Sequence, residues 1–206
     1  ESKAQPKEVS NEPEPRQEPE QPSAGTVGQD RVPVSEYGVK GKSTAVITAD
    51  GKTRRATYYA VEAENLIPSH DARRNFAKNE GALENELPYH DPKQGADSRE
   101  TVEKISKVLQ DKVSLLTSDT QSPIDGPPIL DEFGAVLGGN ARSMGMQLAY
   151  AGNQAGRLKS HMQSEAEKFG IDPKDVAKLK EPVIVRVLDE VFDKTTISSL
   201  LNEALS

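Results

Sequence analysis

The chain has 206 residues with 26 basic and 33 acidic side chains, a formal net charge of −7, and neither cysteine nor tryptophan. Without cysteine there is no disulfide framework, no thiolate nucleophile, no CxxC redox pair and no cysteine-ligated metal. No apolar run reaches the roughly 18 residues of a transmembrane helix, and nothing resembles a cleavable signal peptide, so we expect no membrane partner. The chain begins at Glu1, and a helix-like pattern runs to Ser206. We therefore expect a piece of a longer protein.

The first 30 residues differ in composition from the rest of the chain. They hold five of the 14 prolines and seven acidic against three basic residues, so −4 of the net charge of −7 lies there. Such a segment buries too little apolar surface to offset its ordering entropy. We predict a disordered acidic tether over residues 1–40, a domain over 41–195, and the start of a further helix over 196–206.

The first half of the domain predicts a hairpin, a loop-rich stretch and a helix. Residues 44–49 and 52–61 are rich in β-branched and aromatic side chains and flank Asp50-Gly51, which suits a tight turn. A loop-rich stretch runs to about Gly95, with a short helix expected near 73–79. Asp97 then precedes Glu100 by three residues, ahead of apolar residues at helical spacing over 102–109, which predicts a capped amphipathic helix.

The second half predicts another hairpin, several helices and a late strand. The hairpin runs from 129 to 137 and turns near Phe133-Gly134, and helices are expected over 141–150 and 158–169. Asp172-Pro173 supplies an N-cap and a proline that open a shorter helix. Residues 182–188 form the most continuous apolar strand, and helical spacing returns over 196–205. This mixture predicts an α/β (α+β) domain.

The segment from Gly138 to Arg142 joins a predicted strand to a predicted helix. Two glycines allow close backbone approach and positive φ, while the N–H groups and dipole of a helix start favour an anion. Arg142 adds a bidentate donor for phosphate. The segment lacks the Gly-Lys-Ser/Thr of a Walker loop and is not a dinucleotide fingerprint. A phosphate cradle and a plain turn with an N-cap both remain open.

Three separated motifs carry a family resemblance. They are Tyr59-Ala-Val-Glu-Ala-Glu-Asn-Leu-Ile-Pro-Ser-His-Asp71, the run from Gly126 to Arg142, and Pro182-Val-Ile-Val-Arg-Val-Leu188. In this order they resemble the ParB/sulfiredoxin-like superfamily, in particular the ParB-like domain of phage and plasmid anti-restriction and helicase–methylase polyproteins. The resemblance covers roughly 44–192 and implies a small mixed sheet flanked by helices.

The resemblance also implies a ligand site. In ParB-like relatives the loop that corresponds to Gly138–Arg142 binds a nucleotide triphosphate. By position, Gly138, Gly139, Asn140 and Arg142 would contact the phosphates of ATP or CTP with Mg²⁺. The opposite wall would consist of Ser69, His70, Asp71 and Arg73. Sulfiredoxins place a reactive cysteine where this chain has Asn140, so sulfinic acid reduction is excluded. The implied setting is a DNA-associated phage or plasmid protein, cytoplasmic or packaged in a virion, whose partners are DNA and the rest of a larger polypeptide.

Other functions stay open beside nucleotide or DNA phosphate binding. A Mg²⁺-dependent nuclease would use carboxylates, a histidine and Arg142. His70-Asp71 and His90-Asp91 are the nearest approach to metal ligands, but they are also ordinary loop dipeptides, and we assign no metal site and no catalytic residue. The basic residues expected to contact DNA are Lys52, Arg54, Arg55 and Arg74. A third alternative is a non-catalytic interaction module that has lost its ligand.

Overall fold

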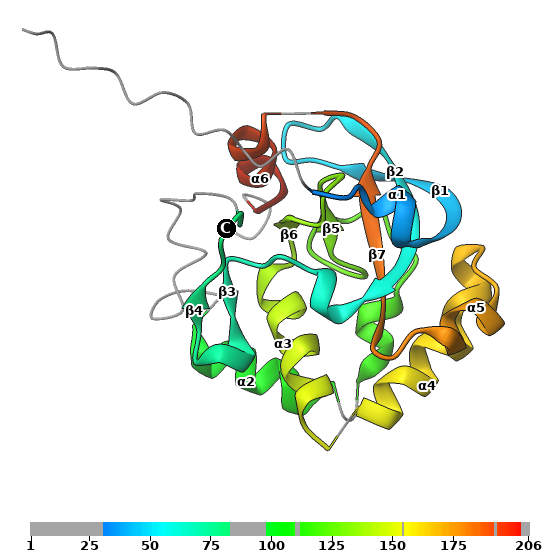
Figure 1. The fold of residues 1–206 in the computed structure, drawn as a ribbon. Helices are drawn as coiled ribbons and strands as arrows, with labels where there is room; N and C mark the ends of the chain where they lie inside the picture. Colours follow the sequence, from blue (N-terminus) through cyan, green and yellow to red (C-terminus); the bar gives the residue numbers. More distant parts are fainter. Residues whose placement is uncertain (1–30, 83–97, 110–111, 154, 192, 203–206) are drawn as a thin grey trace, which may run out of the picture.

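The computed structural model describes residues 31–82, 98–109, 112–153, 155–191 and 193–202. Its centre is a five-stranded mixed sheet with the strand order β1-β2-β7-β5-β6 (Figure 1). Neighbouring strands pair antiparallel, except that β5 runs parallel to β7. The strands are β1 (Val39–Ile47), β2 (Thr53–Glu62), β5 (Ile129–Leu130), β6 (Val136–Gly138) and β7 (Pro182–Leu188). A separate two-stranded sheet consists of β3 (His70–Asp71) and β4 (Ala77–Lys78).

Helices flank the sheet, as expected for this fold class. They are α1 (Val34–Tyr37), α2 (Arg99–Val108), α3 (Asn140–Ala151), α4 (Ala155–Glu165), α5 (Pro173–Lys178) and α6 (Lys194–Asn202). Figure 1 shows α2 to α5 together at one end of the view and α6 at the other. Helices α2 and α3 pack closely at Gly145, where a Cβ would lie only 2.6 Å from Cγ2 of Ile105. Within the described ranges, no helix has both the length and the apolar character needed to cross a membrane.

Both predicted hairpins are present, and each turns at a glycine. Gly51 has φ +75° between β1 and β2, and Gly134 has φ +90° between β5 and β6. A side chain at Gly134 would also place its Cβ 2.7 Å from the carbonyl oxygen of Asn65. Glycine is thus required at this second turn both by its backbone angle and by the space available.

Strand β7 lies in the middle of the sheet, between β2 and β5, and every one of its residues is buried. A strand covered on both faces is expected to be apolar throughout rather than alternating. Six of its seven residues fit that pattern, and the exception is Arg186, which is 0% exposed. The main core joins this strand to side chains such as Met146 of α3 and Met162 of α4.

Described residues on both sides of the predicted bounds 41 and 195 are packed into the hydrophobic clusters. Val34 is fully buried in the main core and β1 begins at Val39, so the ordered chain starts before residue 41. At the other end, Ile197 and Leu201 of α6 pack into one cluster with Leu137 and Leu188 of the sheet. Helix α6 therefore packs against the sheet, and the predicted division into a tether, a domain and a further helix stays a prediction. Residues 1–30 lie outside the described residues.

Two local predictions between β2 and α2 need correction. The helix expected near 73–79 is wrong, because Asn75 and Phe76 have φ of +55° and +59°, and the chain turns back into β4. A 3₁₀ turn over Ala72–Arg74 stands in its place. The cap expected at Asp97 is also wrong: the N-cap of α2 is Ser98, whose side chain accepts from Thr101 N. Asp97 itself lies outside the described residues.

Candidate functional site

The first turn of α3 is the part of the fold that the sequence singles out as an anion site. Strand β6 ends at Gly138, and Gly139 reverses the chain with φ +81° and ψ +34° before the helix begins at Asn140. The N-cap residue Gly139 has no side chain to cap this turn, and the first turn holds no acidic residue. The N-terminal end of α3 thus keeps its positive partial charge.

Gly138 and Gly139 have different surroundings. Gly138 is buried, and a Cβ there would lie 3.5 Å from Ile129 and from Leu201, an ordinary packing distance. Gly139 is half-buried, and a Cβ there would lie 2.8 Å from Nη2 of Arg142. The Arg142 guanidinium therefore lies over Gly139, at the start of the helix.

Asn140 and Ser69 are bonded directly to each other. Oδ1 of Asn140 accepts from the backbone N–H of Ser69 at 2.8 Å, and Nδ2 donates to Oγ of Ser69 at 2.7 Å. His70 extends the group, since its Nδ1 lies 2.9 Å from Oγ of Ser69. The structure thus brings together the two predicted walls at these residues. The hydrogen bonds between Asn140 and Ser69 join the two predicted walls directly. The side-chain atoms of Asn140 that make these bonds therefore stabilise the fold.

The other two residues of the predicted wall, Asp71 and Arg73, are held by hydrogen bonds and ion pairs. Oδ1 of Asp71 accepts from Arg73 N at 2.9 Å, and Oδ2 accepts from Nε of Arg74 at 2.8 Å. Burial would raise the pKa of Asp71, but these hydrogen bonds outweigh it and hold the pKa below its usual value. Arg73 also reaches Glu181, with Nη1 at 3.6 Å from Oε2. Both residues thus fix the 3₁₀ turn between β3 and β4.

Arg142 holds a loop as well as lying over Gly139. Its Nη1 donates to the carbonyl of Gly126 at 2.5 Å and its Nη2 to the carbonyl of Pro123 at 3.2 Å. Burial lowers the pKa of its guanidinium to about 10, so Arg142 is still a cation at neutral pH. Both acceptors belong to the segment 118–128, which we call the proline loop.

Arg186 also binds the proline loop, and the sequence analysis missed it. From the centre of β7 its guanidinium donates five hydrogen bonds to carbonyls of the proline loop, namely those of Thr120, Ser122, Asp125 and, twice, Pro127. Burial, and then repulsion by Arg142, lower its pKa to about 10. The signal that points to this residue is a single charge inside the apolar run 182–188.

The four residues predicted to contact DNA all lie within ion-pair distance of a carboxylate. Lys52 and Arg54 face Asp50 at 3.6 and 3.2 Å, and Arg55 faces Glu190 at 3.6 Å. These three belong to the β1–β2 hairpin, whereas Arg74 lies in the turn between β3 and β4, elsewhere in Figure 1. The structure therefore places three of them on one hairpin and the fourth on a different element.

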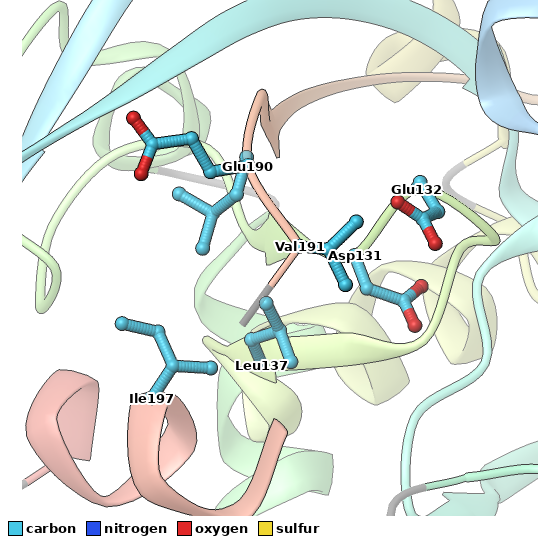
Figure 2. A pocket seen from close by; sticks show the side chains of 7 residues that line it. Asp131, Glu132, Leu137, Glu190, Val191 and Ile197 are labelled. Atoms are coloured by element: carbon cyan, nitrogen blue, oxygen red, sulfur yellow. The ribbon is translucent and has the colours of Figure 1, made fainter. Parts of the chain in front are cut away.

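A small pocket lies between α6 and the turn of the second hairpin. Figure 2 shows its apolar side chains, with Leu137 and Ile197 among them, and the carboxylates of Asp131, Glu132 and Glu190 around them. The Asp131 carboxylate accepts from the N–H groups of Phe133 and Ala135 and so shapes the turn. These carboxylates would repel an anion, so the pocket does not suit a phosphate.

The part of the chain that the structure describes contains no cluster of side chains that could bind a metal ion. No group of three or more histidine or carboxylate side chains is placed to hold an ion there. His70 and Asp71 belong to that part, with the contacts given above. His90 and Asp91 lie outside the described residues.

Comparison with known proteins gives one family. The model of the ddrB-like ParB superfamily domain matches residues 49–189, which is about two thirds of the chain. The match includes all of β2, the proline loop, α3 and β7. Searches of curated proteins and of solved structures give no match. The chain therefore belongs to the ddrB-like ParB superfamily domain family.

Proposed function

We propose that this domain binds a nucleotide triphosphate or a DNA phosphate at the first turn of α3, as a module of a phage- or plasmid-type DNA-processing or anti-restriction protein. The observation that carries the proposal is the open first turn. Gly139 is left-handed and has no side chain to cap the turn, no acidic residue lies in the turn, and the Arg142 guanidinium lies over Gly139. Backbone N–H groups, a helix dipole and an arginine together form a typical phosphate environment. Family membership favours a DNA-associated setting but does not by itself supply the ligand.

The ligands that fit this chemistry are ATP or CTP with Mg²⁺. Arg142 and the start of α3 would hold the phosphates, and Mg²⁺ would neutralise part of their charge. No residue of the site is identified as a base that activates water, so the proposal is binding, with hydrolysis to be measured separately. The alternative function is a Mg²⁺-dependent nuclease, and nicking of a supercoiled plasmid would measure that activity.

The first experiment is isothermal titration of the full chain with ATP, CTP and GTP, each with and without Mg²⁺. Wild-type protein should release heat with at least one nucleotide. Arg142→Ala should abolish that heat, while Arg157→Ala, which removes an exposed arginine from α4, should not change it. Circular dichroism melts of both variants show whether each one is folded.

A second variant separates the phosphate site from the hydrogen bonds that Arg142 makes to the proline loop. Ala141→Asp places a carboxylate in the first turn of α3, where it suits the helix dipole but repels an anion. Ala141 is half-buried beside the cluster of Ala72, Val102 and Met144, so we expect a folded protein that is less stable by roughly 1–3 kcal/mol and binds no nucleotide. Binding by Ala141→Asp equal to wild type would refute the site. If no nucleotide and no DNA binds the wild-type chain, the interaction-module alternative replaces the proposal.

A further inference from the structure

The proline loop is held by the guanidinium groups of two arginines, Arg142 and Arg186. Among the described residues neither Arg142 nor Arg186 forms an ion pair within 4.0 Å, and the acceptors of both are backbone carbonyls of this loop. Asp125 attracts both guanidiniums from a greater distance and is itself exposed. Two like charges are thus held close together in a buried place, where repulsion is poorly screened.

The two arginines are not equally committed to the loop. Arg186 is 0% exposed, makes five hydrogen bonds to the loop, and its own backbone N–H donates to Pro128 O at 2.8 Å. Arg142 makes two such bonds, is half-buried, and lies over Gly139 at the open end of α3. Arg186 is therefore a fixed anchor, and Arg142 is the arginine shared between the loop and the candidate site.

We propose that the proline loop and a bound phosphate compete for the Arg142 guanidinium, so that phosphate binding at α3 loosens the loop. This inference rests on the proposed function. A phosphate oxygen is a stronger partner for a guanidinium than a peptide carbonyl, because the bond is charge-assisted on both sides. When Arg142 turns to the phosphate, the carbonyls of Gly126 and Pro123 lose their donor, while Arg186 keeps the rest of the loop in place. The anion also relieves the repulsion between the two guanidiniums.

Competition of this kind has a reciprocal consequence. If ligand binding weakens the contact between Arg142 and the loop, then weakening that contact must strengthen ligand binding. Phosphate binding would therefore change the mobility of the proline loop, including its exposed residues Ile124 and Asp125. A partner that contacts these residues would respond to whether the site is occupied. A purely structural role of Arg142 predicts no such link.

Gly126→Ala tests the link without touching Arg142. Gly126 has φ +73°, and a Cβ there would lie 2.5 Å from the carbonyl oxygen of Ser118, so alanine must displace the loop at the carbonyl that Arg142 binds. We expect a less stable protein that binds Mg-ATP or Mg-CTP about 3- to 10-fold more tightly, because the loop competes less strongly for the Arg142 guanidinium.

Gly170→Ala is the matched control. Gly170 has φ +71°, and a Cβ there would lie 2.9 Å from Lys42 N, so its substitution carries a similar backbone strain far along the chain from Arg142. It should lower stability and leave nucleotide affinity unchanged. Hydrogen exchange gives an independent readout. Saturating Mg-ATP or Mg-CTP should speed exchange at the amides of Ile124, Asp125 and Gly126 in the wild type by threefold or more.

The outcomes separate the two proposals. Equal or weaker binding by Gly126→Ala than by Gly170→Ala, or slower exchange in the loop with nucleotide bound, would overturn the competition while leaving nucleotide binding intact. No binding of Mg-ATP, Mg-CTP, Mg-GTP or DNA by the wild type would overturn the proposed function, and the competition with it.

Discussion

Asn140 and Ser69 form a two-way hydrogen-bonded pair that joins segments 71 residues apart. The amide oxygen of Asn140 accepts from Ser69 N at 2.8 Å, and its amide nitrogen donates to Ser69 Oγ at 2.7 Å. Asparagine suits this position because one side chain supplies both an acceptor and a donor. The pair ties the segment before β3 to the start of α3, and so fixes the geometry of the candidate site from one side.

Replacing Asn140 by alanine should destabilise the fold strongly. Asn140→Ala leaves the buried N–H of Ser69 without this acceptor, whereas Ser69→Ala removes a hydroxyl and keeps the N–H bond. We expect losses in the free energy of unfolding of about 2–3 kcal/mol for Asn140→Ala and about 1 kcal/mol for Ser69→Ala, measured by urea denaturation. A double-mutant cycle should give a coupling of at least about 0.5 kcal/mol. Additive effects would show that the pair does not act as one unit.

Arg186 should be as important for stability as an apolar core residue. Arg186→Met fits the apolar strand but removes all five bonds to the proline loop, at about 1 kcal/mol for each net hydrogen bond. We expect the free energy of unfolding to fall by roughly 3 kcal/mol or more. Arg186→Lys keeps a cation with fewer donors and should lie between wild type and Arg186→Met. As a control, the exposed Arg157→Met should change the stability by less than about 0.5 kcal/mol. A methionine variant as stable as wild type would mean that the buried charge costs as much as its bonds return.

Much of the fold was predictable because it depends on local chemistry. Both hairpins turn where Asp50-Gly51 and Phe133-Gly134 allow positive φ, and α5 opens with the predicted Asp172 cap, whose side chain accepts from Lys174 N. The parallel pairing of β5 with β7 depends on contacts between distant segments and has no local pattern. The helix predicted near 73–79 failed for a related reason. Arg99 of α2 binds Asn75 through two hydrogen bonds and lies 5.0 Å from the Phe76 ring, and these contacts favour the left-handed turn.

The helix start at the candidate site was predictable, but the contacts of its side chains were not. The glycines and Arg142 lie at the start of α3, as predicted, and anion binding there stays a prediction. The acceptors of Arg142 and Arg186 are backbone carbonyls, which every residue carries, so no residue type in the sequence marks the proline loop as their partner. Likewise, Asn140 and Ser69 were both assigned to phosphate by the family resemblance, and neither local motif shows that they pair with each other across 71 residues.

DNA binding, where it occurs through the β1–β2 hairpin, should respond to Glu190. Arg55 is 75% exposed and lies 3.6 Å from Glu190, so this surface pair is weak and the arginine can turn to a phosphate. Glu190→Gln should therefore strengthen binding to a fluorescent DNA duplex in anisotropy titrations. Arg55→Ala should weaken it and lower the slope of log affinity against log salt by about 0.9.

Lys104→Ala is the control for that titration, because Lys104 is an exposed lysine of α2 that pairs with Glu100. It should leave both the affinity and the salt slope unchanged. A salt slope that is the same in wild type, Arg55→Ala and Lys104→Ala would exclude the hairpin as a DNA contact.

His161 should make stability depend on pH in the range just below neutrality. Its Nε2 lies 2.9 Å from Oγ1 of Thr117, which fixes α4 against the segment 113–117. Burial lowers the pKa of His161, with Glu165 acting to raise it and Lys168 to lower it further. The unfolded chain therefore takes up the proton more readily than the folded one, and stability falls as the pH drops through the ordinary histidine value of about 6.5.

Urea denaturation at pH 7.5, 6.5 and 5.5 measures this effect. His161→Gln keeps a polar partner for Thr117 but does not titrate, so its free energy of unfolding should vary less over this range than that of the wild type. Carboxylates whose pKa is lowered in the fold, such as that of Asp119, lose their contribution to stability only as the pH falls through about 4 and below. They therefore do not affect the comparison between pH 7.5 and 5.5. Identical pH dependence in the two proteins would mean that the His161 ring does not control the docking of α4, and the loss of stability would then have to come from other groups.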